Sequence, residues 1–412
     1  MVPILLTWGT VDAFRGNTGS PTLAAYRPCP VCASVRWQTV LPFRDFQFYS
    51  DSKVAPKRHG FDVCQCSECL ALFTNPAFTP FGFQILFEEA GQSYGSSPGR
   101  FDEQIRWMSE RGLLEGGTTL MDVGCSDGGF VLKLPDTVRR IGVDIDQPSI
   151  DRALAARGKA NAEFFTADFE RFELGRDIDV ITMFHVLEHL PSPRGVLDHL
   201  ASVSTPETRL LVEVPILEGG STKDINGFFS VHHLTHFSRG SLENLLDASG
   251  WHIVDAQVQP DYNGYRVIAV PGPRLGTRLE AADDRQLLYR YLSDWYRALE
   301  DIEARLVTLD APASVVIWGG GIHLEFLYQF TSLFRGSDAR RYIVIDSDSA
   351  KQGKTWRGIP IVSPDAVTEL DWDSACLLVS THGSQAAVVD AAKKRGIPET
   401  AIVTLYDEVR RY

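Results

Sequence analysis

The chain has 412 residues, which predicts two or three domains, and its 44% hydrophobic and 23% charged residues are typical of a globular protein. A net charge of −13 opposes binding to nucleic acid, because phosphate binding requires an excess of Lys and Arg. No apolar run reaches the roughly 20 residues of a membrane span, and the N-terminal MVPILLTWG lacks the basic residues of a signal peptide, so we expect a cytoplasmic location.

The N-terminal region, residues 1–80, contains two CxxC pairs, CPVC and CSEC. Disulfides are rare in a reducing compartment. Two thiolates on a tight turn can bind one Zn²⁺, and two such turns complete a tetrahedron. We therefore predict a zinc ribbon, with chance cysteines as the alternative. Cys64, on the strand before the second pair, is not expected to bind the ion; the predicted ligands are Cys29, Cys32, Cys66 and Cys69.

The central region, residues 81–275, alternates apolar runs with helical patterns. Runs at 118–125, 139–146, 177–184 and 209–215 read as buried strands, and helical stretches such as 192–203 separate them. This alternation predicts an α/β fold with a mostly parallel, doubly wound sheet. Ligands of such sheets bind at the carboxyl ends of the strands.

The first of these strands ends in DVGCSDGGF (122–130), a glycine-rich loop that lets the backbone approach a ligand closely. Ser126 departs from the GxGxxG pattern. Asp144 ends the next strand, about 20 residues on, where an acid can accept ribose hydroxyls. Asp168, in TADFE, follows the third strand and could reach an adenine amino group. The three features in this order predict a nucleoside-containing cofactor, with NAD as one candidate.

The successive motifs DVGCSDGG, GVDID, TADFE and FHVLEHLPSP resemble those of class I S-adenosylmethionine-dependent methyltransferases, over roughly residues 100–270. NAD enzymes are not expected to carry HVLEHLPSP. The resemblance implies that the glycine loop faces the methionine part, the second strand the ribose, and the third the adenine. The implied cofactor-binding residues are Asp122, Gly124, Cys125, Ser126, Gly128, Asp144, Ile145, Asp168, Phe169 and His185.

The order of a cysteine domain, this core and a further α/β domain resembles the zinc-containing C-methyltransferases of nucleotide-linked deoxysugars. In that family a segment like YHEHLSYFS follows the fifth strand and carries a catalytic histidine; here it reads SVHHLTHFS (230–238). The resemblance implies His233 as general base. His232 stands where the family has Glu, Ser230 where it has Tyr, and His236 where a Tyr is usual. O-methylation or a different acceptor therefore fits as well as C-methylation.

The chemistry of the histidines supports this assignment. An unperturbed imidazole, with a pKa of about 6.5, suits proton removal at neutral pH. His232 and His236 would face one way on a helix and could share a metal there. The next helix is predicted to begin only after this segment, at a Ser cap, so a loop over the active site is expected. The candidate catalytic group is His233, His232, His189 and Glu188.

The turn DYNGYRV (261–267) lies between the last two strands and could line an acceptor pocket through Tyr262, Asn263 and Tyr265, together with His236. The alternative is an ordinary hairpin turn built on Asn-Gly.

Residues 276–412 read as a linking helix (283–309) followed by a second Rossmann-like unit that begins at 314–330 with strand, glycine turn and helix. Gly319 and Gly321 could hold a substrate phosphate at the helix N-terminus, or only make the turn. The family's own C-terminal domain, with a similar KQG…GIPI stretch, helps hold the substrate's nucleotide. Asp346, at the next strand end, leaves NAD as an alternative.

The sequence thus predicts an S-adenosylmethionine-dependent methyltransferase with structural Zn²⁺. Its expected acceptor is a small molecule, a nucleotide-linked sugar, glycan or related natural-product intermediate, methylated on C or O by a monomer or homodimer. The alternatives are a methyltransferase of a non-sugar natural product and a non-catalytic protein with zinc-ribbon and Rossmann units. A methyltransferase of RNA or protein is disfavoured for RNA by the acidic charge.

Overall fold

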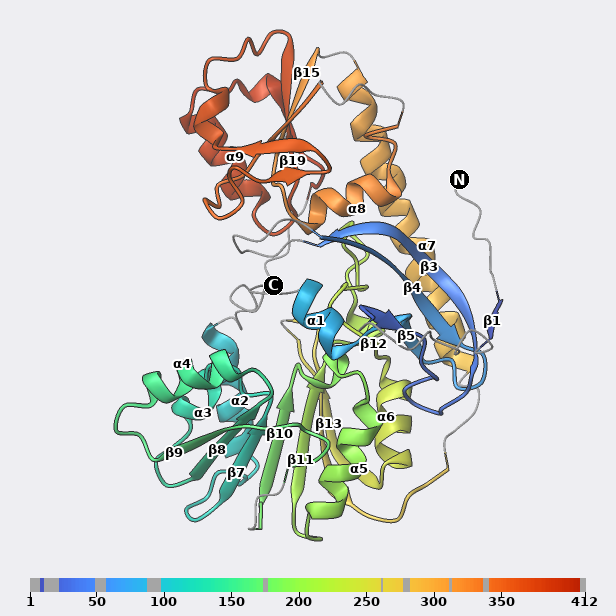
Figure 1. Cartoon of the computed structure of the whole chain (residues 1–412), viewed down its shortest axis with the longest axis vertical. Helices are drawn as coiled ribbons and strands as arrows, with labels where there is room; N and C mark the ends of the chain where they lie inside the picture. The colour runs from blue at the N-terminus through green and yellow to red at the C-terminus, as the bar shows by residue number, and fades with distance from the viewer. Residues whose placement is uncertain are drawn as a thin grey trace.

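The computed structural model describes residues 8–10, 22–48, 57–86, 98–172, 177–260, 262–276, 282–310, 313–335 and 341–407. Three large sheets follow one another along the long axis of the molecule (Figure 1). The first seven residues, with most of MVPILLTWG, lie outside the described ranges. None of the described helices is long and apolar enough to cross a membrane.

The N-terminal sheet has the strand order β1-β3-β4-β5-β12. Its edge strand β12 (Thr235–His236) comes from the histidine segment and pairs antiparallel with β5 (Leu72–Asn75). The predicted active-site loop is therefore fastened to the N-terminal region. The remaining elements here are β1 (Trp8–Thr10), β3 (Arg36–Phe48), β4 (Lys57–Cys66), the small pair β2 (Ala24–Ala25) and β6 (Ala77–Phe78), and α1 (Pro80–Leu86).

The central sheet has seven strands in the order β13-β14-β11-β10-β7-β8-β9. The strands from β11 to β9 are parallel, and β14 runs antiparallel to both of its neighbours. The parallel-rich sheet predicted from the sequence is confirmed. Its strands are β7 (Thr119–Val123), β8 (Arg139–Asp144), β9 (Ala162–Thr166), β10 (Val180–Phe184), β11 (Arg209–Val214), β13 (Trp251–Val258) and β14 (Tyr265–Pro271).

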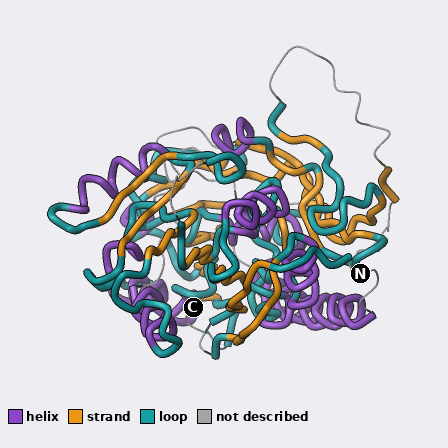
Figure 2. The backbone as a smooth tube through the Cα atoms, turned by 90° about the horizontal axis from the view of Figure 1, so that it is seen from below, coloured by secondary structure: helices purple, strands orange, loops and turns teal. Residues whose placement is uncertain are grey.

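Helices cover both faces of this sheet because successive strand residues point to opposite sides. Leu120 packs with α2 (Pro98–Ser109), α3 (Gly129–Lys133) and α4 (Gln147–Arg157). Met121, the next residue, packs with α5 (Pro193–Val203) and α6 (Arg239–Ala248). Figure 2, seen from below, shows helices on more than one side of the strands. The chain order reverses between β7 and β10, and ligands of open α/β sheets bind at such a switch point.

The C-terminal region begins with α7 (Ala282–Leu306), near the helix expected at 283–309, and continues in a six-stranded sheet of order β17-β18-β16-β15-β19-β20. Its strands are parallel except for the β17–β18 pair. The elements are η5 (Val307–Asp310), β15 (Ser314–Trp318), α8 (Ile322–Phe330), β16 (Tyr342–Ile345), β17 (Thr355–Trp356), β18 (Ile359–Val362), η7 (Pro364–Val367), β19 (Ala375–Val379), α9 (Gln385–Lys394), η8 (Glu399–Ala401) and β20 (Ile402–Val403).

The long β3–β4 hairpin connects the three sheets (Figure 1). At one end Phe43 packs edge-on against Phe326 and Phe330 of α8. At the other end Trp37 belongs to the same core as the central sheet. The expected boundaries 1–80, 81–275 and 276–412 stay a prediction, since apolar cores run across them.

Candidate active site

The loop after β7 has a backbone that glycine makes possible. Gly124 has φ +79°, and a Cβ there would lie 2.4 Å from Cγ2 of Val186. Gly128, the N-cap of α3, also has φ +79°, and its Cβ would meet the Phe164 ring. Ser126 has φ +50°, a left-handed conformation that is uncommon without glycine. The backbone of the loop can therefore lie close to a ligand at the carboxyl end of β7.

Asp144 fixes this loop from the neighbouring strand end. Its carboxylate accepts hydrogen bonds from the amides of Ser126 (2.8 Å) and Asp146 (2.9 Å), while burial raises its pKa. A carboxylate has about four acceptor positions, so two remain for a ligand. Beside it, the Ile145 side chain is 62% exposed, which is unusual for a large apolar residue and leaves a surface for an aromatic ring.

The other predicted cofactor residues lie around the same sheet edge. Asp168 is exposed after β9, and Phe169 beside it is buried. Cys125 is buried under the loop. Asp122 is buried within β7 and accepts a hydrogen bond from Thr182 Oγ1 at 2.6 Å; burial raises the pKa of Asp122 to about 7. Asp122 thus joins β7 to β10 just before the loop begins.

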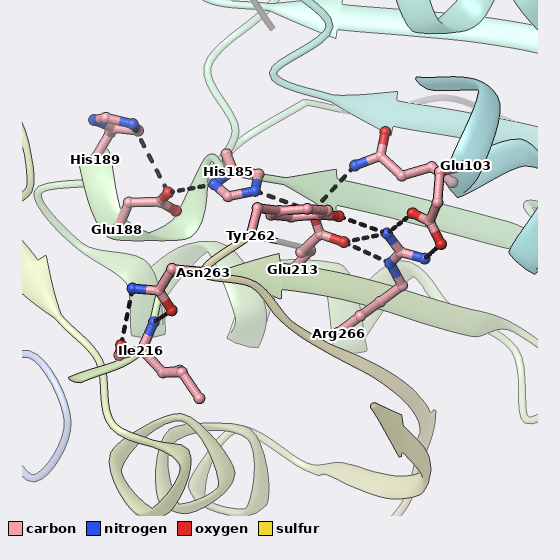
Figure 3. A network of polar contacts seen from close by, with 10 residues as sticks. Glu103, His185, Glu188, His189, Glu213, Ile216, Tyr262, Asn263 and Arg266 are labelled. Carbon is pink, nitrogen blue, oxygen red and sulfur yellow. Dashed lines mark hydrogen bonds and ion pairs between the residues drawn. The ribbon is translucent and has the colours of Figure 1, made fainter. Parts of the chain in front are cut away.

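A chain of polar side chains crosses the carboxyl ends of β10 and β11 (Figure 3). His185, with φ +57°, lies between two carboxylates: its Nε2 is 3.0 Å from Glu213 Oε1, and its Nδ1 is 3.4 Å from Glu188 Oε1. Arg266 donates to Glu213 at 2.5 Å and to Glu103 of α2 at 2.7 Å. These contacts join the glycine-loop edge of the sheet to α2.

Glu213 lies at the centre of this network of polar side chains. Its side chain is fully buried and also accepts hydrogen bonds from Tyr262 (2.9 Å) and Gln104 (3.2 Å). Burial alone would raise the pKa of Glu213, but the contact with His185 and the charge of Arg266 lower it to about 2. The Glu213 carboxylate therefore stays charged. Burial lowers the pKa of His185, but its contacts with Glu188 and Glu213 outweigh burial and raise that pKa above its usual value.

The histidine segment is bound to the turn that follows β10, η3 (Leu187–His189). The Leu234 amide donates to the Glu188 carbonyl at 2.7 Å, and His189 Nδ1 lies 3.0 Å from the His232 carbonyl. As a result the side chains of Glu188, His189 and His233 gather, each with a nitrogen or oxygen within 4.8 Å of the other two. The sequence grouped these three residues with His232 as candidate catalytic residues, and His232 is not a member of this cluster.

A cavity of about 210 Å³ opens beside His233. Its lining residues are Pro215, Gly220, Ser221, Asp224, Gly227, Phe228, Ser230, His233 and Asn263. The Asn263 side chain bridges the backbone of Ile216 through two hydrogen bonds, Ile216 N to Oδ1 at 3.1 Å and Nδ2 to Ile216 O at 3.0 Å, and so holds the wall of the cavity.

Elements from the C-terminal region complete this wall. Tyr291 of α7 accepts a hydrogen bond from the Phe228 amide at 2.5 Å. Asp224, a lining residue, lies 3.7 Å from Nδ1 of His382, and the Ile225 amide donates to the Tyr406 hydroxyl at 3.2 Å. The C-terminal region therefore packs against residues that line the cavity.

Three predicted acceptor-site residues, His236, Tyr262 and Tyr265, do not line this cavity. His236 is buried between Phe228 and Phe229, with Nε2 3.3 Å from Thr74 Oγ1. Tyr265 donates to Glu243 of α6 at 2.8 Å, whereas Tyr262 donates to Glu213 of β11. Among the described residues, neither His232 nor His236 belongs to a group of three or more possible metal ligands.

The glycine turn of the C-terminal sheet holds Gly319 and Gly321. Gly319 has φ +121°, and a Cβ there would lie 2.5 Å from the Ser380 carbonyl oxygen, so the turn itself requires glycine. The Gly320 amide donates to Asp346 at 2.9 Å. Lys351 Nζ lies 3.6 Å from the Cβ position of Gly321, next to the N-terminus of α8.

The four predicted metal ligands come together in the N-terminal region. Cys29, Cys32, Cys66 and Cys69 form one group. The sulfurs of Cys29 and Cys69 are 3.6 Å apart, and those of Cys32 and Cys66 are 3.5 Å apart. A disulfide would need about 2.05 Å, whereas thiolates on a tetrahedral Zn²⁺ with 2.3 Å bonds lie about 3.8 Å apart. The group therefore fits a zinc ion, and Cys64 stays outside it.

Residues 98–256 match a family model described as a methyltransferase domain. The chain therefore carries a methyltransferase domain over these residues. A search among curated proteins finds no match.

Solved methyltransferases resemble the chain over less than half of its length. An S-adenosylmethionine-dependent methyltransferase from Clostridium acetobutylicum is 11% identical, with 46% of this chain and 98% of that chain covered and a TM-score of 0.37. Magnesium protoporphyrin IX methyltransferase from Synechocystis, with bound SAH, is 20% identical, with 48% and 89% covered and a TM-score of 0.35. A methyltransferase from Aquifex aeolicus is 17% identical, with 43% and 100% covered and a TM-score of 0.34.

The methyltransferase domain also uses residues that sequence reasoning missed. Glu213 and Arg266 form its buried ion pair, and Asp224 lines the cavity. Glu213 stands in the apolar strand RLLVEV and Arg266 in YRVIAV. A charged residue in a buried strand is rarely unpaired, so these two positions carried a signal. Asp224 lies in a loop and carried none.

Proposed function

We propose that this methyltransferase transfers a methyl group from S-adenosylmethionine to a carbon or hydroxyl oxygen of a small acceptor bound in the cavity beside His233. The expected acceptor is a nucleotide-linked sugar, a glycan or a related natural-product intermediate. The observation that carries the proposal is the position of His233, a titratable side chain on the wall of a cavity next to the cofactor edge of the sheet. A monomer or homodimer in the cytoplasm is part of the same proposal.

The cofactor would bind at the carboxyl ends of β7 and β8. The open loop at Gly124 would hold its methionine part, the free acceptor positions of Asp144 its ribose, and Ile145 and Asp168 its adenine. When bound, S-adenosylmethionine supplies a methyl group on a sulfonium, which is already a good leaving group. The chain's task is then to align the acceptor and to remove its proton.

The walls of the cavity favour an acceptor with several hydroxyl groups. Ser221, Asp224 and Ser230 offer oxygens for hydrogen bonds, and Phe228 offers an apolar ring. Polar groups around one aromatic surface suit a sugar ring, whose edges are polar and whose faces carry C–H groups. A flat, wholly apolar acceptor would make no hydrogen bonds with these three side chains.

A phosphate-bearing acceptor is supported by the C-terminal turn. Backbone amides at a helix N-terminus favour anions, and Lys351 adds a cation beside Gly321. Asp346 occupies one amide, that of Gly320, so we assign the phosphate contact to the Gly321 end of the turn.

We assign His233 as the group that takes the proton from the acceptor, with His189 and Glu188 as its neighbours. Burial lowers the pKa of His233 below its usual range, so the imidazole is neutral with a free lone pair but is a weaker base than an exposed histidine. No carboxylate orients it in the way the deoxysugar C-methyltransferase segment would imply, which favours an acidic acceptor such as a hydroxyl next to an electron-withdrawing group.

Structural Zn²⁺ at the four cysteines would stabilise the N-terminal region, which contacts the histidine segment. Arg27, two residues before Cys29, donates to the carbonyls of Leu234 and Pro191, each at 2.5 Å. Thr74 of β5 donates to the His233 carbonyl at 2.9 Å. The ion would therefore stabilise the region that positions the catalytic segment.

A mass-spectrometric screen tests the proposal. The full-length protein is incubated with S-adenosylmethionine and a panel of nucleoside-diphosphate sugars, free glycosides and non-sugar phenols. We expect one methyl group to be added to a sugar-containing acceptor, with S-adenosylhomocysteine formed in equal amount. Methylation of phenols alone would support the non-sugar alternative. Binding of S-adenosylmethionine without transfer to any member of the panel would argue for the non-catalytic alternative.

A further inference from the structure

We propose that Glu188, His189 and His233 bind a divalent metal ion that faces the acceptor cavity, in addition to the ion at the four cysteines. The proposal rests on the proposed function and changes one step of it, the removal of the acceptor's proton. Binding of the ion itself can be tested without any acceptor.

The three side chains have the composition of a metal site. Two imidazole nitrogens and one carboxylate oxygen are a common ligand set for Zn²⁺, Mn²⁺, Fe²⁺ and Co²⁺. Each residue places one such atom within 4.8 Å of the other two. Ligand atoms bound to one ion at about 2.1 Å lie within about 4.2 Å of each other, so binding needs only a small closure. His189 Nε2 and Glu188 Oε1 are already 3.9 Å apart.

Two of the groups are buried without a hydrogen-bond partner. The Glu188 side chain is 1% exposed, and neither of its oxygens accepts a hydrogen bond from a described residue. His233 Nδ1 is also buried and unpartnered among the described residues. A buried carboxylate without compensation is costly. A cation between these atoms would satisfy both, and it explains why they point together.

The alternative without a metal is that His185 alone compensates the buried charge of Glu188. His185 Nδ1 is 3.4 Å from Glu188, which is long for a hydrogen bond, and its Nε2 is committed to Glu213 at 3.0 Å. That contact also leaves Nδ1 of His233 unexplained.

The surroundings hold the candidate ligands in the orientation a metal requires. Metal-binding histidines usually donate their other ring nitrogen to a carbonyl or carboxylate. His189 does this: Nδ1 lies 3.0 Å from the His232 carbonyl, so Nε2 keeps its lone pair toward Glu188. The Leu234–Glu188 backbone hydrogen bond fixes the two segments. The side chain of His189 is 35% exposed, which gives an ion a route from solvent.

Three protein ligands leave open positions on the ion, as in catalytic metal sites. An acceptor hydroxyl bound there would have a lowered pKa and lose its proton to water. The resulting oxygen forms the new O–CH₃ bond while the S–CH₃ bond of S-adenosylmethionine breaks, and the electron pair stays on sulfur. In this form of the enzyme His233 is a ligand of the ion and water takes the proton. The acceptor atom is then oxygen.

Zinc counting on the full-length protein tests the site. After dialysis against Zn²⁺ and removal of free ion, we expect two equivalents per chain in the wild type by elemental mass spectrometry. Glu188→Gln and His189→Asn should each keep one, and Cys66→Ser should lose the other. His252→Asn, with its ring bonded to the Pro273 carbonyl far from this group, should keep two. Melting curves confirm that each variant is folded.

One equivalent in the wild type, or two in both Glu188→Gln and His189→Asn, would overturn the proposal. Calorimetry with S-adenosylmethionine separates this result from a failure of the proposed function. If the site is real and catalytic, Glu188→Gln binds the cofactor within about 3-fold of wild type and loses methyl transfer by about 100-fold. Unchanged methyl transfer in Glu188→Gln would remove the ion's catalytic role while the proposed function stands.

Discussion

The backbone amide of Leu234 donates a 2.7 Å hydrogen bond to the carbonyl of Glu188. This contact joins the histidine segment to the turn after β10, across 46 positions of the chain. Because it involves backbone atoms, it fixes the place of His233 whatever the neighbouring side chains are. The same segment continues as β12 in the N-terminal sheet, so two parts of the chain hold it over the cofactor edge.

His233→Asn tests the catalytic group. We expect methyl transfer to fall by about 100-fold or more, since a positioned base or an equivalent metal ligand supplies at least that much. Binding of S-adenosylmethionine should change little, because His233 lies on the acceptor side. Initial rates and calorimetry measure the two quantities. His252→Asn is the matched control, and full activity in His233→Asn would remove this residue from the mechanism.

Replacement of a cysteine tests the structural ion. In Cys66→Ser we expect loss of one zinc equivalent and a free energy of unfolding lower by several kcal/mol, because binding energy of a structural metal is folding energy. Cys64→Ser provides the control, since Cys64 is equally buried on the same strand but lies outside the group. Elemental analysis and urea unfolding are the readouts. Equal zinc in both variants would refute the four-cysteine site.

Substitutions of Glu213, the partner of Arg266, test the buried network of polar side chains. Glu213→Ala leaves the buried Arg266 guanidinium with Glu103 and the Tyr262 hydroxyl as its remaining partners among the described residues, and we expect a loss of about 3 kcal/mol of unfolding free energy. Glu213→Gln can keep part of the hydrogen bonding and should lose less. Glu163→Ala breaks an exposed pair with Arg139 and should cost less than about 1 kcal/mol. Similar urea midpoints for Glu213→Ala and Glu163→Ala would contradict this account.

Asp122 predicts a pH dependence of stability. Its folded-state pKa is about 7 against an ordinary value of 3.8, so the folded protein holds a proton that the unfolded chain releases. Stability from this residue is therefore present below pH 4 and is lost as the pH rises toward 7. Asp122→Asn removes this loss. The difference in unfolding free energy between Asp122→Asn and wild type should rise by about 2–3 kcal/mol from pH 5 to pH 7. A constant difference, measured without cofactor, would contradict the buried neutral acid.

The periodic elements could be predicted from the sequence because local patterns determine them. The apolar runs became β7, β8, β10 and β11, and the helical pattern after residue 282 became α7. The CxxC spacing likewise brought the four cysteines together, since each pair is local and only their meeting depends on the fold.

The composition of the site could be predicted only in part. Glu188, His189 and His233 were grouped from motif resemblance, but their mutual distances depend on a backbone contact between η3 and residue 234. The sequence predicted a loop rather than a helix at His232 and His236, but not the pairing of His236 with Leu72 of β5 that places His236 in the N-terminal sheet. The contribution of Asp224, His382 and Tyr406 depends on how the C-terminal region packs, which no local pattern encodes.

Calorimetric titration with S-adenosylmethionine tests the central claim most directly. We predict that the wild-type protein binds one cofactor molecule per chain. Asp144→Ala, which removes the carboxylate that holds the loop at Ser126, should weaken binding at least about 10-fold, which corresponds to about 1.4 kcal/mol. Absence of binding to the wild-type protein, or equal affinity in Asp144→Ala, would contradict the proposed cofactor site.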